Sequence, residues 1–251
     1  MMSSQPLTDR VAIVTGASSG LGARFATVLA EAGAQVVAAA RGLDRLDELA
    51  RTHPAVHAVR CDVTDDDDRA QLVAAALERF GRIDVCVNNA GVSSGGPERQ
   101  ATLDAFRAVM RLNVDALFGL SQAVAGPMRD QGSGSIVNIS SMFSLVASAP
   151  VPDAGYVASK SAVNGLTREL AAQWARDGVR VNAIAPGFFP SEMTAELVED
   201  ERSQRWFERQ CPMGRPGRID ELDGVLLFLA SDASSYCTGQ VITVDGGWTI
   251  R

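Results

Sequence analysis

The stretch Val11-Ala12-Ile13-Val14-Thr15-Gly16-Ala17-Ser18-Ser19-Gly20-Leu21-Gly22 decides the fold of this chain. It begins as an apolar, β-branched run that is typical of a buried strand, and an alanine-rich helical pattern follows the glycines. A strand, a glycine turn and a helix start bring several backbone N–H groups and the positive end of a helix dipole together, which suits a pyrophosphate. Because any tight strand-to-helix turn needs small residues, the glycines alone leave nucleotide binding open.

The same alternation of strand and helix patterns continues to the end of the chain. The expected strands are Val11–Thr15, Gln35–Ala40, Val56–Cys61, Ile83–Asn88, Ser135–Ser140, Val179–Ile184 and Gln240–Val244. The expected helices include Gly20–Ala32, Asp65–Phe80, Leu103–Asp130, Ala154–Asp177 and Asp220–Ala230. Continuous apolar strands separated by helices predict an α/β fold, a doubly wound parallel sheet of the Rossmann type with about seven strands, in a single domain over residues 1–251.

Composition and charge exclude several classes of protein. The 251 residues are 46% hydrophobic and carry a formal net charge of −7, which speaks against nucleic acid or anionic lipid as partners. No uncharged apolar run approaches the roughly 18 residues of a membrane span, and the N-terminus lacks a secretory pattern, so we expect a cytoplasmic protein. The four cysteines lie far apart and there are two histidines, so we expect neither a metal site nor a disulfide framework.

Two segments have a less regular composition. The acidic run 65–68 follows Thr64 where a helix should begin, so we interpret Thr64 as the helix cap and the acids as a favourable first turn rather than as a metal site. Residues 186–219 are rich in Pro, Phe and charge and too long for a structureless connection. We expect them to carry a short helix and to act as a lid over the substrate.

Several motifs together resemble one known family. In chain order they are Thr15-Gly16-x-x-x-Gly20-x-Gly22, Asn88-Asn89-Ala90-Gly91, Asn113, Ser141, Tyr156-x-x-x-Lys160 and Pro186-Gly187. This series is similar to the short-chain dehydrogenases/reductases and spans essentially the whole chain. The chain length resembles the compact subfamily, which has no separate substrate domain.

The resemblance implies a set of cofactor contacts. They are Gly16, Ser18, Ser19, Gly20, Leu21, Gly22, Asp62, Val63, Asn89, Ala90, Gly91, Tyr156, Lys160, Pro186, Gly187, Phe189 and Ser191. In the family pattern Asp62 and Val63 contact the adenine, although Asp62 could instead be an acid at a helix entry. Ser191 stands where the family often has a threonine that contacts the carboxamide.

The end of the second expected strand bears on which nicotinamide cofactor is used. In Rossmann units an acid at this place binds the ribose hydroxyls, whereas a nearby Arg accommodates a 2′-phosphate. Here Ala40 occupies the acid position and Arg41 follows it, which favours NADP(H) over NAD(H). The alternative is that Arg41 opens a solvated loop, with Arg45 after it.

The resemblance assigns the catalytic roles to Asn113, Ser141, Tyr156 and Lys160. Tyr156 and Lys160 lie four residues apart, so they share a helix face, and Lys160 is the only lysine of the chain. We expect its ammonium to lower the pKa of the phenol by about three units, which needs about 4 kcal/mol, within reach of one charge about 4 Å away. A phenol with a lowered pKa can exchange a proton with a carbonyl oxygen.

Two of these assignments keep alternatives. Ser141 precedes Tyr156 by fifteen residues, two more than the family pattern implies, so Ser140 or Ser144 could be the partner of the tyrosine. Asn113 resembles the residue that holds a water linking the lysine to solvent. A buried Asn that satisfies backbone groups is the other interpretation, and both could hold.

The expected substrate side is largely apolar. Its candidate residues are Val92, Ser93, Met142, Phe143, Leu145, Val146, Pro150, Val151, Phe188, Phe189, Met193 and Trp206. We therefore expect a ketone–alcohol oxidoreductase acting on an uncharged hydrophobic carbonyl. The alternatives are a 3-oxoacyl thioester reductase, for which Arg129, Arg168 and Arg176 could receive an acidic carrier, and a non-catalytic NADP(H) sensor.

The family resemblance also bears on assembly. Members of the compact subfamily commonly form tetramers through the long helices at 103–130 and 154–177 and through the C-terminal region. We therefore expect a homotetramer or a homodimer.

Overall fold

The computed structural model describes residues 5–93, 102–148, 152–190 and 201–250. Seven parallel strands form one sheet in the described residues, as the sequence predicts, and the structure gives their order as β3-β2-β1-β4-β5-β6-β7. The strands are β1 Val11–Thr15, β2 Gln35–Ala40, β3 Val56–Arg60, β4 Val85–Asn88, β5 Gly134–Ile139, β6 Val179–Pro186 and β7 Val241–Val244. The strand order reverses between β1 and β4, and in such sheets ligands bind beyond the carboxyl ends at this reversal.

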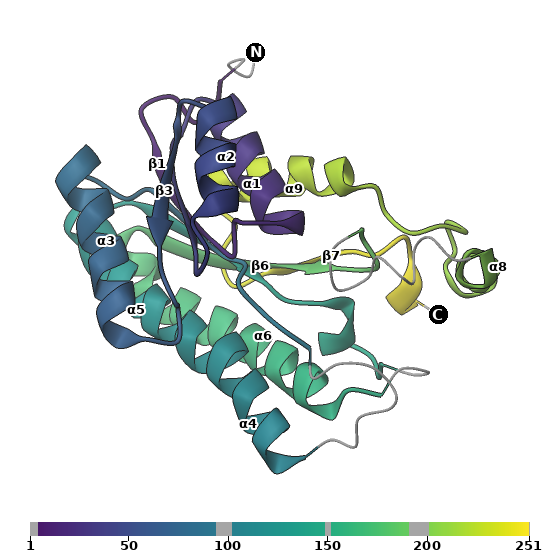
Figure 1. Ribbon diagram of the computed structural model, residues 1–251. Coiled ribbons are helices and arrows are strands. Elements are labelled where there is room, and N and C mark those ends of the chain that lie inside the picture. Colours follow the sequence, from purple (N-terminus) through teal and green to yellow (C-terminus); the bar gives the residue numbers. More distant parts are fainter. Residues whose placement is uncertain (1–4, 94–101, 149–151, 191–200, 251) are drawn as a thin grey trace.

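Helices cover both faces of the sheet (Figure 1). They are α1 Gly20–Glu31, α2 Asp44–Thr52, α3 Asp66–Phe80, α4 Leu103–Met110, α5 Ala116–Asp130, α6 Ala154–Trp174, α8 Glu201–Gln210 and α9 Asp223–Ala230. Side chains of α1 and α9, among them Phe25 and Leu226, form the core on one face. Side chains of α3, α5 and α6, among them Leu72 and Leu120, form the core on the other. Burial on both faces explains why the strands are continuous apolar runs.

The expected helix Leu103–Asp130 contains a π-helical turn at Arg111–Asp115 between α4 and α5. The backbone stays helical across it, so periodicity alone does not reveal the extra residue of the turn. Asn113 lies within it and is buried. π-turns inside helices are often found at functional sites.

One local expectation is corrected by the structure. The cap of α3 is Asp65 and not Thr64, because the Asp65 carboxylate accepts hydrogen bonds from the backbone N–H groups of Asp67 and Asp68. Helix α2 was not expected, since it is short, polar and buries one side chain, Leu46. The short helix expected within 186–219 is present as α8. Within the described residues no helix is long and apolar enough to cross a membrane.

Candidate active site

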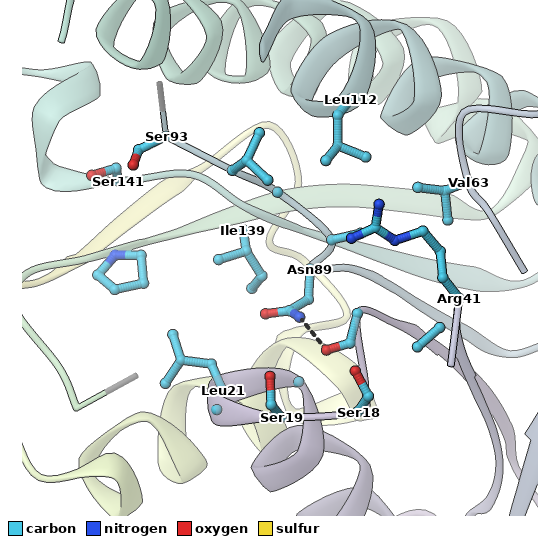
Figure 2. Close-up of a pocket in the computed structure, with 18 of the residues that line it drawn as sticks. Ser18, Ser19, Leu21, Arg41, Val63, Asn89, Ser93, Leu112, Ile139 and Ser141 are labelled. Carbon is cyan, nitrogen blue, oxygen red and sulfur yellow. Dashed lines mark hydrogen bonds between the residues drawn. The ribbon is translucent and has the colours of Figure 1, made fainter. Parts of the chain in front are cut away.

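A cavity of about 770 Å³ lies at the carboxyl ends of the strands, beside the reversal between β1 and β4. Every described residue that the sequence indicates as a cofactor contact lines it: Gly16, Ser18, Ser19, Gly20, Leu21, Gly22, Arg41, Asp62, Val63, Asn89, Ala90, Gly91, Tyr156, Lys160, Pro186, Gly187 and Phe189. Ser191 lies outside the described residues. Figure 2 shows Arg41 on one side of this cavity and Ser141 on the other.

The glycine turn between β1 and α1 depends on the absence of side chains. A Cβ at Gly22 would lie 2.1 Å from the backbone oxygen of Gly16, so the start of α1 packs directly on the turn. Gly16 itself has a φ of +64°, which favours glycine. The turn is held by Asn89, whose amide donates to the backbone oxygens of Thr15 at 2.9 Å and of Gly16 at 3.3 Å, the latter drawn in Figure 2.

The start of α1 suits a pyrophosphate. Ser19 precedes the helix and its side chain caps no backbone N–H group. The first N–H groups of the helix therefore have no side-chain acceptor, and they lie at the positive end of the helix dipole. Since Gly16, Gly20 and Gly22 leave room for close approach, this part of the cavity fits the phosphates of a dinucleotide.

The end of the cavity near β2 and β3 combines one cation with one anion. Arg41 is exposed, and among the described residues no side chain holds its guanidinium in a hydrogen bond or an ion pair. The Asp62 carboxylate accepts from the N–H of Thr64 at 3.0 Å and from its hydroxyl at 2.8 Å. These hydrogen bonds, together with the charge of Arg41, lower the pKa of Asp62. Asp65 caps α3, and Asp62 holds the turn that leads into this helix, so the adenine contact and the acid at a helix entry both stay interpretations of Asp62.

The opposite end brings Ser141, Tyr156 and Lys160 together. The hydroxyl of Ser141, which follows β5, lies close enough to the hydroxyl of Tyr156 on α6 to lower the pKa of this phenol. The Lys160 ammonium lies one turn further along α6, 5.6 Å from the centre of the tyrosine ring, and donates to the backbone oxygen of Ile139 at 2.7 Å. Three groups capable of proton exchange therefore meet at the edge of the cavity.

The expected lowering of the Tyr156 pKa is wrong for this structure. Burial raises the pKa of the phenol, and the nearby hydroxyl of Ser141 acts in the opposite direction with a smaller effect. Burial also lowers the pKa of Lys160 to about 8. Removing water from both groups disfavours their charged forms, which outweighs the attraction of the ammonium for a phenolate. Tyr156 is consequently a neutral proton donor at neutral pH.

The structure distinguishes the three candidate serines. The hydroxyl of Ser140 donates to the Asn164 side-chain oxygen at 2.7 Å, and that of Ser144 donates to the backbone oxygen of Ser141 at 2.5 Å. Neither hydroxyl is bonded to Tyr156. Ser141 is therefore the serine whose hydroxyl meets the phenol.

Asn113 does not line the cavity, because its amide is engaged inside the protein. Its oxygen accepts from the backbone N–H of Val92 at 2.9 Å, and its nitrogen donates to the backbone oxygen of Val92 at 2.8 Å and to Ser159 at 2.9 Å. The interpretation as a buried Asn that satisfies backbone groups is thus confirmed for its side chain. The water that it was expected to hold stays a prediction.

Five aromatic rings gather beside Ser141, and we call them the aromatic cluster. Phe188 packs edge-on against Phe143, Trp206, Phe207 and Trp248, with ring centres between 5.1 and 5.8 Å apart. These rings come from the loop after β5, the segment after β6, helix α8 and the C-terminal turn. Pro150, Val151 and Met193, also expected on the substrate side, lie outside the described residues.

Some lining residues escaped the sequence analysis. Leu112 and Thr64 line the cavity although no motif marks them, and Phe207 joins the aromatic cluster from a segment in which only Trp206 was singled out. Leu112 directly precedes Asn113, so its position next to this motif residue was the available signal. Among the described residues, no group of His, Cys, Asp and Glu side chains is arranged to hold a metal ion.

Comparison with known proteins agrees with this geometry. The sequence model of a family described as Enoyl-(Acyl carrier protein) reductase matches residues 16–249. Gluconate 5-dehydrogenase of Gluconobacter oxydans is 41% identical over 248 residues, covering 97% of this chain and 96% of that protein. The 3-oxoacyl-[acyl-carrier-protein] reductase FabG of Thermotoga maritima is 38% identical over 248 residues, covering 97% of this chain and 99% of its own length.

Solved structures show the same fold. The gluconate 5-dehydrogenase of Burkholderia cenocepacia, in complex with NADP and tartrate, superposes with a TM-score of 0.93 at 38% identity, covering 100% of this chain and 99% of that one. A short-chain type dehydrogenase/reductase of Mycobacterium marinum superposes with a TM-score of 0.92 at 37% identity, covering 99% of this chain and 98% of that one. With the glycine turn and the Ser141–Tyr156–Lys160 group in one cavity, this chain belongs to the short-chain dehydrogenase/reductase family of oxidoreductases.

Proposed function

We propose that this protein is an NADP(H)-dependent oxidoreductase that interconverts a ketone and a secondary alcohol by hydride transfer. One observation carries the proposal: Ser141 and Tyr156, with Lys160 beside the tyrosine ring, and the glycine turn at the start of α1 line the same cavity. The cavity thus combines side chains that can exchange protons with a turn that can bind a dinucleotide. The intact set of proton-transferring side chains also speaks against a pure cofactor sensor.

The roles of the side chains follow from their protonation. A bound nicotinamide would supply or accept the hydride. During reduction Tyr156, neutral because burial raises its pKa, donates its phenolic proton to the carbonyl oxygen. The hydroxyl of Ser141 holds the same oxygen by a hydrogen bond. The ammonium of Lys160, beside the ring, stabilises the charge that the phenol gains.

We infer a preference for NADP(H) from the end of β2. Ala40 offers no carboxylate to repel a 2′-phosphate, and Arg41 lines the cavity with its guanidinium free of other described side chains. An arginine is well suited to bind a phosphate through two parallel hydrogen bonds. Related structures from Burkholderia cenocepacia and from Beutenbergia cavernae contain bound NADP, which supports this inference.

We infer that the substrate is an uncharged, largely apolar carbonyl compound. The described cations that line the cavity are Arg41, at the end near β2, and Lys160, whose ammonium is bonded to Ile139. A carboxylate of a sugar acid would need a cation of its own. Apolar residues instead line the cavity, among them Val92, Leu112 and Phe189.

A 3-oxoacyl thioester is the second candidate substrate, because the Thermotoga maritima relative bears that name. It would use the same catalytic residues, but it requires a basic surface for its carrier. One of the three arginines considered for this surface, Arg129, is paired with Asp177 at 2.5 Å. Because this pairing neutralises part of the basic surface, it speaks against an acidic carrier as partner.

We further propose that residues 186–219 act as the lid and that the protein works as a cytoplasmic homotetramer. Helix α8 brings Trp206 and Phe207 to the aromatic cluster beside Ser141, which is the place of a lid. The four cysteines are free thiols, as is usual in a reducing compartment. Light scattering on the purified protein tests the tetramer, and a monomer at micromolar concentration would contradict it.

The test of the function is a set of initial rates with NADPH and, in parallel, with NADH. The substrates are a bulky uncharged ketone, a 3-oxoacyl thioester and a keto sugar acid. Faster oxidation of NADPH with the ketone than with either other substrate supports the proposal. A preference for the thioester makes the acyl reductase the function, and a preference for the sugar acid contradicts the apolar substrate. No turnover with any of them, while cofactor binds, would contradict the oxidoreductase.

A further inference from the structure

The segment 140–144, which we call the Ser141 loop, is held by a chain of hydrogen bonds that begins and ends on it. Ser140 donates to the side-chain oxygen of Asn164 at 2.7 Å, and the side-chain nitrogen of Asn164 donates to the hydroxyl of Ser144 at 2.8 Å. The hydroxyl of Ser144 in turn donates to the backbone oxygen of Ser141 at 2.5 Å. Asn164 therefore bridges the two ends of the loop that carries Ser141.

The direction of these hydrogen bonds is consistent at every step. A hydroxyl has one proton to give, and that of Ser144 points to the backbone oxygen of Ser141, so it must accept from Asn164. The opposite side of the amide, its oxygen, then faces Ser140. All members are buried or half-buried, so water cannot easily replace a lost bond.

Asn164 stands on the helix that carries the other two groups of the site. It lies one turn after Lys160 on α6, and Ser140 also approaches the backbone oxygen of Lys160 at 3.2 Å. The same side chain thus connects the loop of Ser141 to the helix of Tyr156 and Lys160. Because proton transfer needs hydrogen-bond distances, the relative placement of these two elements controls the reaction.

We propose that Asn164 is a positioning residue, which keeps the hydroxyl of Ser141 in place against Tyr156 without touching the substrate. This inference rests on the proposed function, in which these two hydroxyls hold the carbonyl oxygen. Loss of Asn164 lets the Ser141 loop relax. The hydroxyl of Ser144 also loses its donor and no longer has to point at the backbone oxygen of Ser141. The side chain of Ser141 can then adopt more than one orientation.

The test compares two buried positions of the same helix. Asn164→Leu removes both hydrogen bonds to the loop and keeps the branched shape of the side chain. The matched control is Thr167→Val, because the Thr167 hydroxyl, also fully buried on α6, accepts from Asn138 of β5 at 2.9 Å but has no bond to the Ser141 loop. Each variant therefore loses a buried polar group of α6: Asn164 is bonded to Ser140, which follows β5, and Thr167 is bonded to Asn138 within β5.

We expect Asn164→Leu to lower kcat by about 10- to 100-fold, as displacements near 1 Å do. The dissociation constant for NADPH, measured by its fluorescence, stays within about threefold of the parent value. Thr167→Val, assayed at a temperature where both variants are folded, keeps kcat within about threefold. An equal loss of kcat in both variants, or no loss in Asn164→Leu, would overturn the proposal.

A second readout needs no turnover. Hydrogen exchange of the segment 142–146 reports the loop directly, because the N–H groups of Ser144 and Leu145 are bonded within it. Exchange there speeds up in Asn164→Leu but not in Thr167→Val. If Asn164→Leu does not fold, Ser144→Ala breaks the same chain at a half-buried position and must speed up the same exchange. Unchanged exchange refutes the positioning role even if the parent protein proves to have another activity.

Discussion

At the scale of single residues, burial sets the chemistry of the site more than charge does. Lys160 is the only lysine of the chain and lies beside the ring of Tyr156, yet the pKa of the phenol is raised. Burial disfavours the charged forms of both groups, so a neutral phenol is the favoured form. This protonation suits a group that gives its proton to a ketone.

Replacing Tyr156 by Phe tests this role. The variant loses the phenolic proton but keeps the ring, so we expect turnover to fall by about 100-fold or more. Binding of NADPH, followed by its fluorescence, should stay close to that of the parent protein. Residual activity above a few per cent would show that another group transfers the proton.

The lowered pKa of Lys160 predicts a dependence of stability on pH. In the folded protein this pKa is about 8, because burial disfavours the ammonium, whereas the unfolded chain keeps the ordinary value of 10.5. Between these values the unfolded state binds more protons, so the free energy of unfolding rises with pH. From pH 7 to pH 10 the contribution is about 2 kcal/mol.

Urea unfolding of the parent protein and of Lys160→Met at several pH values measures this contribution. The parent should gain stability relative to the variant as the pH rises through 8. Parallel curves for the two proteins would mean that Lys160 keeps its ordinary pKa in the folded state.

Ala40 and Arg41 predict the choice of cofactor. A carboxylate at position 40 would repel a 2′-phosphate and accept hydrogen bonds from ribose hydroxyls. We expect Ala40→Asp to shift the ratio of kcat/KM for NADPH over NADH by about tenfold toward NADH, equal to about 1.4 kcal/mol. Steady-state rates with both cofactors check this, and an unchanged ratio removes the role given to Arg41.

At the scale of elements, helix ends follow individual hydrogen bonds. Asp65, one of four successive acids, caps α3 because its carboxylate reaches two backbone N–H groups, while Thr64 is bonded to Asp62. A run of equivalent residues gives several possible starts to a helix. Which of them becomes the cap depends on the direction in which the backbone leaves the preceding strand.

Asp65→Ala should therefore lower the free energy of unfolding by about 1 kcal/mol, the usual cost of losing a cap. Asp67→Ala is the control, since that exposed side chain belongs to the same acidic run and forms no cap. Chemical unfolding of both variants decides the matter. Equal losses would point to the helix dipole rather than to the cap.

At the scale of the whole molecule, the aromatic cluster ties together segments that are distant in the sequence. Trp248 of the C-terminal turn lies 4.9 Å from Trp206 of α8, measured between ring centres, and both contact Phe188. The chain end therefore helps to hold the proposed lid. Loss of this contact should therefore destabilise the proposed lid as well as the C-terminal turn.

Trp248→Ala tests the connection. Truncation of a buried tryptophan costs about 3 kcal/mol or more, and here we expect part of the effect as faster hydrogen exchange in residues 205–211. Trp174→Ala is the matched control, because Trp174 is equally buried but belongs to the core formed with α3 and α5. Similar exchange rates in α8 for both variants would show that the C-terminal turn does not stabilise the lid.

The amino-acid sequence by itself determined the parallel sheet, the glycine turn and the places of Ser141, Tyr156 and Lys160. These depend on patterns within a few residues, such as apolar runs, small residues at a turn and the spacing of one helical turn. Only the tertiary structure decided the raised pKa of Tyr156 and the bonding of Ser140 and Ser144 to Asn164.

The π-turn around Asn113 and the aromatic cluster likewise appear only in the folded chain. Local spacing states which residues share an element, but burial and hydrogen bonding depend on neighbours that the fold brings from elsewhere in the chain. Asn164 and Ser144 are twenty residues apart in sequence and 2.8 Å apart in the structure, between side-chain nitrogen and hydroxyl. Such contacts are set by the packing of α6 on β5.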